Sequence, residues 1–82
     1  MVHGQVQGVF FRAGCRDEAN ARDVAGSADN LPDGSVEMVL EGKQSAVEEM
    51  VAWARAGPTH ADVTDVDVYE ERPQGLSGFA VN

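Results

Sequence analysis

Segments with helical spacing of apolar residues alternate along the chain with short segments of strand-like alternation. The clearest helix is expected over residues 45–56, where apolar residues recur every three or four positions. Ser45 and Glu48 have the spacing of a capping box at its start. Gly57 and Pro58 follow it, and a glycine before a proline favours the end of a helix.

A first helix is expected over residues 11–24, with Phe11, Cys15 and Ala19 on one face and Gly26 as its C-terminal stop. Apolar residues alternate most clearly over residues 36–41, which a Pro-Asp-Gly turn joins to a weaker strand over residues 27–30. Further strands are predicted at residues 2–6, 63–69 and 79–81.

The predicted order of elements is βαββαβ, and this order limits the possible folds to a few. Two βαβ halves with right-handed crossovers build an antiparallel sheet with both helices on one face. The sequence therefore predicts an α+β fold of the ferredoxin-like kind, as one small domain over residues 1–82. Such a fold hosts many unrelated functions, so the function has to be inferred from a site.

The charge of the chain argues against one class of partner. Fourteen acidic residues against six basic ones give a formal net charge of -8, which repels the phosphates of nucleic acids. Lys43 is the only lysine, and the acidic residues are spread along the chain. Such an acidic surface suits a cytoplasm rich in salt, where like charges are screened, and it also occurs in ordinary acidic proteins. Both interpretations stay open.

The chain has no apolar run of membrane-spanning length and no signal-peptide pattern at its start. We therefore expect a soluble, cytoplasmic protein with no membrane partner, and at this size and charge a monomer. Cys15 is the only cysteine, so it cannot form an internal disulfide, and we expect it to be a buried packing residue.

The stretch from Gly4 to Arg12, with the sequence GQVQGVFFR, carries the strongest functional signal. A strand ends there, a glycine allows the backbone to turn, and a helix begins at once. Main-chain amides of such a turn and of a helix N-terminus converge into an anion site. Arg12 adds a guanidinium that can bind two phosphate oxygens side by side. The pattern predicts a phosphate-binding loop.

This nonapeptide resembles the signature of the acylphosphatase family. The stretch NLPDG, from Asn30 to Gly34, resembles the second motif of that family at the expected distance. The pairs Gly57-Pro58 and Gly78-Phe79 resemble it as well, so the resemblance covers essentially the whole chain.

The resemblance implies an enzyme that hydrolyses small acyl phosphates with no metal and no cofactor. Arg12 corresponds to the phosphate-binding arginine of the family, and Asn30 to the catalytic asparagine that positions the attacking water. The substrate-binding residues so implied are Gln7, Gly8, Val9, Phe10 and Phe11, whose amides would form the cradle. We expect one of the two phenylalanines to pack beneath the loop and the other to line the mouth of the site.

Three residues before Asn30 depart from the family pattern. Ser27, Ala28 and Asp29 stand where a large aromatic, a β-branched and often a basic residue are usual. If this strand is regular, Asp29 should point away from the anion site, whereas a bulge would turn its charge towards it. The first strand is also short, because few residues precede the loop.

Two rival functions remain at this point. One is a non-catalytic module that binds anions, and the other is a ferredoxin-like interaction domain that needs neither Arg12 nor Asn30. We expect His3 and His60 to lie outside the site. The acidic residues Asp62, Asp65 and Asp67 are expected to be surface charges with no metal.

Overall fold

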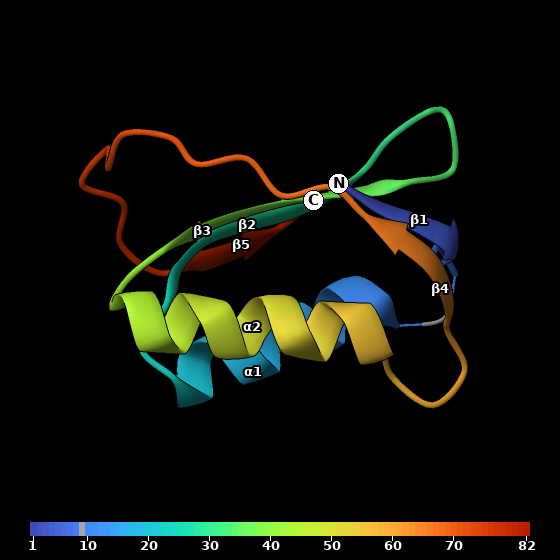
Figure 1. The fold of residues 1–82 in the computed structure, drawn as a ribbon, viewed down its shortest axis with the longest axis horizontal. Helices are drawn as coiled ribbons and strands as arrows, with labels where there is room; N and C mark the ends of the chain where they lie inside the picture. Colours follow the sequence, from blue (N-terminus) through green and yellow to red (C-terminus); the bar gives the residue numbers. More distant parts are fainter. Residues whose placement is uncertain (9) are drawn as a thin grey trace.

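The computed structural model describes residues 1–8 and 10–82, and it places two helices on one face of a five-stranded sheet (Figure 1). The elements in chain order are β1 (Val2–Gln5), α1 (Phe11–Ala21), β2 (Ala25–Asn30), β3 (Val36–Glu41), α2 (Gln44–Ala56), β4 (Asp62–Val66) and β5 (Phe79–Val81). None of the described residues belongs to a helix long and apolar enough to cross a membrane.

The strands lie in the order β4-β1-β3-β2-β5. The first four pair antiparallel, which confirms the ferredoxin-like arrangement. The strand predicted at residues 79–81 is present as β5, but it pairs parallel with β2, so the sheet is mixed and the prediction of an antiparallel sheet is wrong for this strand. The reason is the segment over residues 67–78, which carries the chain from one edge of the sheet to the other before β5 begins.

The first helix ends earlier than its apolar pattern predicted. It stops at Ala21, and Asp23 takes the left-handed conformation with φ 57° where the chain turns away. Gly26 is therefore not the helix stop: it lies inside β2 with φ 145°. A Cβ atom at Gly26 would stand 1.7 Å from the Val39 carbonyl oxygen of the neighbouring strand. Close approach of two strands, which a local pattern cannot reveal, explains this glycine.

The second helix has the predicted end but not the predicted start. Lys43 is the N-cap residue, with no hydrogen bond from a side chain, so the capping box at Ser45 and Glu48 is wrong. Because the helix begins at Gln44, Ser45 lies within its first turn. Gly57 follows the helix with φ 73°, as expected.

The fourth strand is shorter than its sequence pattern and ends at Val66. Val66 lies opposite Val2, and main-chain bonds between Met1 and Asp67 (3.0 and 2.9 Å) close the ladder. Val68 and Tyr69 were predicted to be part of the strand. They lie beyond the ladder and are 53% and 76% exposed.

The core lies between the sheet and the helices. Its largest fully buried side chains are Val2, Val6, Phe11, Cys15, Val36 and Met50. Phe11 packs on the partly buried Trp53, with ring centroids 5.2 Å apart. Burial raises the pKa of the Cys15 thiol to about 12, so it stays protonated and acts as a packing residue, as expected.

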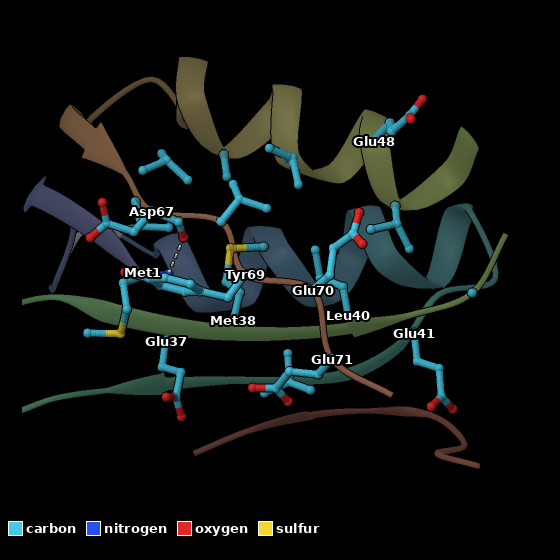
Figure 2. A pocket seen from close by; sticks show the side chains of 18 of the residues that line it. Met1, Glu37, Met38, Leu40, Glu41, Glu48, Asp67, Tyr69, Glu70 and Glu71 are labelled. Atoms are coloured by element: carbon cyan, nitrogen blue, oxygen red, sulfur yellow. Dashed lines mark hydrogen bonds between the residues drawn. The ribbon is translucent and has the colours of Figure 1, made fainter. Parts of the chain in front are cut away.

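Within the described residues, part of β3 has an open edge on the side away from β2. β1 contacts β3 at the single pair Val2–Val36, so within residues 1–8 and 10–82 the Glu37–Glu41 part of β3 pairs only with β2. A hollow of about 790 Å³ lies between this edge, α2 and the segment after β4. Figure 2 shows Met38 and Leu40 on β3, Glu48 on α2, and Tyr69 and Glu70 on the crossing segment.

None of the fourteen acidic side chains is buried. We expect the melting temperature to rise by about 4–8 °C between about 0.1 and 1 M potassium chloride. The Debye length falls from about 10 to about 3 Å over this range, and a gain of about 1 kcal/mol produces such a shift in a domain of this size. Thermal unfolding followed by circular dichroism measures it. A midpoint that does not rise would exclude adaptation to a salt-rich cytoplasm.

Asp29 offers a control for this salt effect. It lies directly opposite Glu37 in the antiparallel pair of β2 and β3, where like charges are destabilising. Asp29→Asn should therefore raise the melting temperature at low salt and reduce its response to salt. An unchanged salt response would place the relevant repulsion elsewhere on the surface.

Candidate active site

The loop between β1 and α1 has residues with positive φ angles and leads directly into the start of the helix. Gly8 and Phe10 both have positive φ angles, 73° and 61°. Phe10 is the N-cap residue of α1, and no side chain caps this end of the helix. The amides of the first helical turn lack intrahelical acceptors and are suited to hold an anion. Val9, also predicted to be part of the cradle, lies outside the described residues.

A hollow of about 240 Å³ opens at this loop. Its lining residues are Val6, Gly8, Phe10, Phe11, Arg12, Ala13 and Val81. Phe11 is 1% exposed and packs in the core beneath the loop, whereas Phe10 is 81% exposed at the mouth of the hollow. The expectation that one phenylalanine packs beneath the loop is confirmed for Phe11, and a role of Phe10 at the mouth of the site stays a prediction.

Arg12 is held by the residue that follows β5. Its guanidinium donates a hydrogen bond to the main-chain oxygen of Asn82. The Asn82 amide in turn donates to the Ala28 carbonyl at 3.1 Å. Ala28 lies two residues before Asn30 on the same strand, so these bonds link the predicted phosphate-binding arginine to the strand that carries the predicted catalytic asparagine.

Asn30 is the last residue of β2, and the strand that positions it is regular. All six residues of β2 pair one to one with β3, with no bulge. Asn30 therefore lies on the same face as the buried Ala28, the face that the helices cover, and Asp29 lies on the other face. The expectation that Asp29 points away from the site is confirmed. Asn30 is exposed because it extends past the covered part of the sheet.

The side chain of Gln7 joins the loop to the turn that follows Asn30. Its Nε2 atom donates to the carbonyl oxygens of Leu31 at 2.8 Å and Ser35 at 2.9 Å. The loop before α1 and the turn between β2 and β3 also lie towards the same end of the molecule (Figure 1). The structure thus brings the two predicted motifs together, although no hydrogen bond joins the described side chains of Arg12 and Asn30.

The turn after Asn30 is closed by its own hydrogen bonds. The Leu31 amide donates to the Ser35 carbonyl at 2.9 Å, and the Gly34 amide to the Leu31 carbonyl at 3.1 Å. The Asp33 carboxylate accepts from both the hydroxyl and the amide of Ser35, and these bonds hold the pKa of Asp33 below its usual value. The turn predicted from Pro, Asp and Gly is confirmed and is fixed at neutral pH.

The remaining candidate groups lie away from this site. His3 pairs with Asp67 at 2.9 Å on the outer face of the sheet, and His60 is exposed after α2. Among residues 1–8 and 10–82, no three His, Cys, Asp or Glu side chains gather as metal ligands would. The larger hollow at the open edge of β3 contains none of the predicted site residues.

Two contacts of the site were not predicted from the sequence. Asn82 binds Arg12 from 70 positions away, and Ser35 binds both Gln7 and Asp33. The order Asp33-Gly34-Ser35 is a recognisable turn pattern and could have indicated the role of Ser35. No local pattern indicates a contact as distant as that of Asn82.

Comparisons with known proteins show the family of this chain. The acylphosphatase family model matches residues 1–81. An acylphosphatase from the haloarchaeon Natronomonas pharaonis is 48% identical over 80 residues, which cover 98% of this chain and 87% of that protein. The crystal structure of an acylphosphatase from Bacillus subtilis superposes with a TM-score of 0.94 at 35% identity and covers 99% of this chain and 91% of that one. HypF from T. kodakarensis superposes with a TM-score of 0.80 at 31% identity, over 98% of this chain and 11% of that much longer one. The chain belongs to the acylphosphatase family.

Proposed function

We propose that this chain hydrolyses small acyl phosphates to a carboxylate and inorganic phosphate, with Arg12 and Asn30 as its working side chains. The observation that carries the proposal is the joining of the two motifs. The Gln7 side chain and the bonds from Arg12 through Asn82 to Ala28 bring the uncapped start of α1 and the end of β2 to one place.

The reaction suits a site that has no acid or base of its own. A carboxylate leaves readily because its conjugate acid has a pKa of about 4, so the leaving oxygen needs no proton. Water attacks phosphorus, the bond from phosphorus to the acyl oxygen breaks, and the proton of the water passes to the phosphate or to solvent. The site has only to place the water and to neutralise charge on the phosphoryl oxygens.

The phosphoryl group would lie in the loop of residues 7–12. Main-chain amides at the start of α1 would donate to its oxygens, and the Arg12 guanidinium would add charge-assisted hydrogen bonds. Arg12 is half-buried and is already held by the Asn82 oxygen, so little side-chain freedom is lost when phosphate binds.

The attacking water would be oriented by the Asn30 carboxamide. Asn30 lies beyond the covered part of the sheet, where water has access, and its backbone is fixed by regular pairing with Val36. An amide can donate to the water or accept from it and carries no charge that would repel the phosphate.

A turnover assay with benzoyl phosphate tests the proposal against its two rivals. Purified protein should release benzoate and phosphate in equal amounts, and this rate should not change when a chelator is added. A non-catalytic anion-binding module would bind inorganic phosphate without turnover. An interaction domain would do neither, so each result assigns one function.

Phe10 should contribute to the choice of acyl group. It lies exposed at the mouth of the small hollow, beside the predicted phosphate site. Phe10→Ala should raise KM for benzoyl phosphate by about 2- to 10-fold, because an aromatic contact contributes about 0.5–1.5 kcal/mol. KM for acetyl phosphate should change less than about twofold, since that substrate has no ring. Steady-state kinetics with both substrates measures the difference.

Tyr69 provides the matched control for Phe10. It is another highly exposed aromatic residue, at 76%, but it lines the hollow on the open edge of β3. Tyr69→Ala should leave both KM values unchanged. An equal change for the two substrates in Phe10→Ala would exclude Phe10 as part of the acyl site.

A monomeric state and a cytoplasmic location remain predictions from the sequence. The net charge of -8 supports the first, because identical acidic chains repel one another. Light scattering of the purified chain would test it directly.

A further inference from the structure

The Gln7 side chain is the only group in the described part of the loop before α1 that bonds directly to the turn after Asn30. It is half-buried, and its partners Leu31 and Ser35 lie 24 and 28 positions further along the chain. A side-chain amide nitrogen carries two hydrogens. Both are used, one for each carbonyl oxygen.

These two carbonyls belong to the two sides of the turn and not to its tip. Each of them also accepts a hydrogen bond inside the turn, the Leu31 oxygen from Gly34 and the Ser35 oxygen from Leu31. Ser35 is only 2% exposed and is further held by Asp33. Gln7 is therefore attached to a rigid support, and Asn30 is the residue directly before that support.

The same bonds argue against a direct role of this side chain in binding phosphate. Because both amide hydrogens are engaged by carbonyls, only the Gln7 carboxamide oxygen is left, and an oxygen acceptor repels a phosphate oxygen. The predicted substrate-binding role of Gln7 is thus limited to its main-chain amide, which stays a prediction.

We propose that Gln7 is a positioning residue, which sets the distance between the phosphate loop and the Asn30 carboxamide by bracing the turn. This inference rests on the proposed function. The placement matters because an error of about 1 Å in a reacting group can cost about 100-fold in rate.

Gln7→Met tests the brace, since it keeps the length of the side chain and removes both donors. We expect kcat for benzoyl phosphate to fall by about 10- to 100-fold. The inhibition constant of inorganic phosphate should change less than about threefold, because the loop amides and Arg12 remain. Gln5→Met is the matched control on the exposed end of β1 and should have no effect.

A double-mutant cycle with Asn30→Ala separates positioning from general damage to the fold. If Gln7 acts through Asn30, the kcat of the double variant should be less than about threefold below the kcat of Asn30→Ala alone. A full additional loss in the double variant would overturn the proposal. So would an unchanged kcat in Gln7→Met alone.

Gln7→Lys keeps the proposal testable if Gln7→Met does not fold. Lysine retains N–H donors at a similar reach, so kcat of Gln7→Lys should lie between the kcat values of wild type and of Gln7→Met. If the Met variant is unfolded, Gln7→Glu takes its place as the variant without N–H donors. A Lys variant no better than these donor-free variants would overturn the proposal. A wild-type chain without turnover would overturn the proposed function itself, a result distinct from an active wild type with an insensitive Gln7.

Discussion

Asn30→Ala should lower kcat for acyl phosphate hydrolysis by about 10²- to 10³-fold while inorganic phosphate still binds. The expected size follows from the loss of one preorganised polar group aimed at the reacting atoms. Stability should hardly change, because Asn30 is exposed at the end of its strand. Steady-state kinetics, with phosphate as a competitive inhibitor, separates the fall in turnover from binding.

Two further variants serve as comparisons for Asn30→Ala. Asn20→Ala changes another exposed asparagine, on α1, and should leave kcat unchanged. Asn30→Asp keeps the size of the side chain but adds a negative charge, so it should weaken phosphate binding as well as turnover. Full activity in Asn30→Ala would exclude the water-positioning role.

Arg12→Ala should raise both KM and the inhibition constant of inorganic phosphate by about 100-fold or more. Hydrogen bonds to charged groups contribute about 1.5–3 kcal/mol each, and a guanidinium can donate two to one phosphate. Arg12→Lys should recover only part of this loss, because a point charge cannot make the two parallel bonds. Titration calorimetry with phosphate and steady-state kinetics measure the two effects.

Arg16 is the control for Arg12. It lies one turn later on α1, is exposed, and pairs with Asp17 at 3.4 Å. Arg16→Ala removes the same charge from the same helix, so it should leave phosphate binding within about twofold. Equal losses in the two variants would indicate a general effect of charge on a very acidic chain and not a phosphate contact by Arg12.

The elements with a strong local pattern could be predicted from the sequence, and those that depend on distant partners could not. The strand predicted at residues 36–41 and the helix predicted at residues 45–56 are both found in the structure, as β3 and α2. Gly26 was misread because its role is set by the Val39 carbonyl across the sheet. Tyr69 was misread because alternation continues after the partner strand has ended.

In the weakest predicted strand, β2, distant partners stabilise a strand that the local sequence does not favour. β2 contains Ser27, Ala28 and Asp29, which have little preference for a strand, yet it pairs along its whole length. It is held between β3 and β5, and the small Ala28 side chain fits completely under the helices. Tertiary contacts override propensity here.

The site was predictable as a pair of motifs but not as a connected structure. Arg12 and Asn30 were identified by the stretches that contain them, and the structure brings those stretches together. The bracing by Gln7 and the contact with Asn82 could not be derived, because hydrogen bonds between residues 24 to 70 positions apart leave no local trace.

The open edge of β3 has a consequence for the behaviour of the protein at high concentration. Within residues 1–8 and 10–82, the main-chain groups of Glu37–Glu41 on the side away from β2 pair with no strand, and such an edge can template a strand from another molecule. Six carboxylates line the hollow at this edge against two arginines, Arg55 and Arg72, and they are Glu37, Glu41, Glu48, Asp67, Glu70 and Glu71. Every copy carries the same negative rim, so molecules repel one another where they could otherwise join.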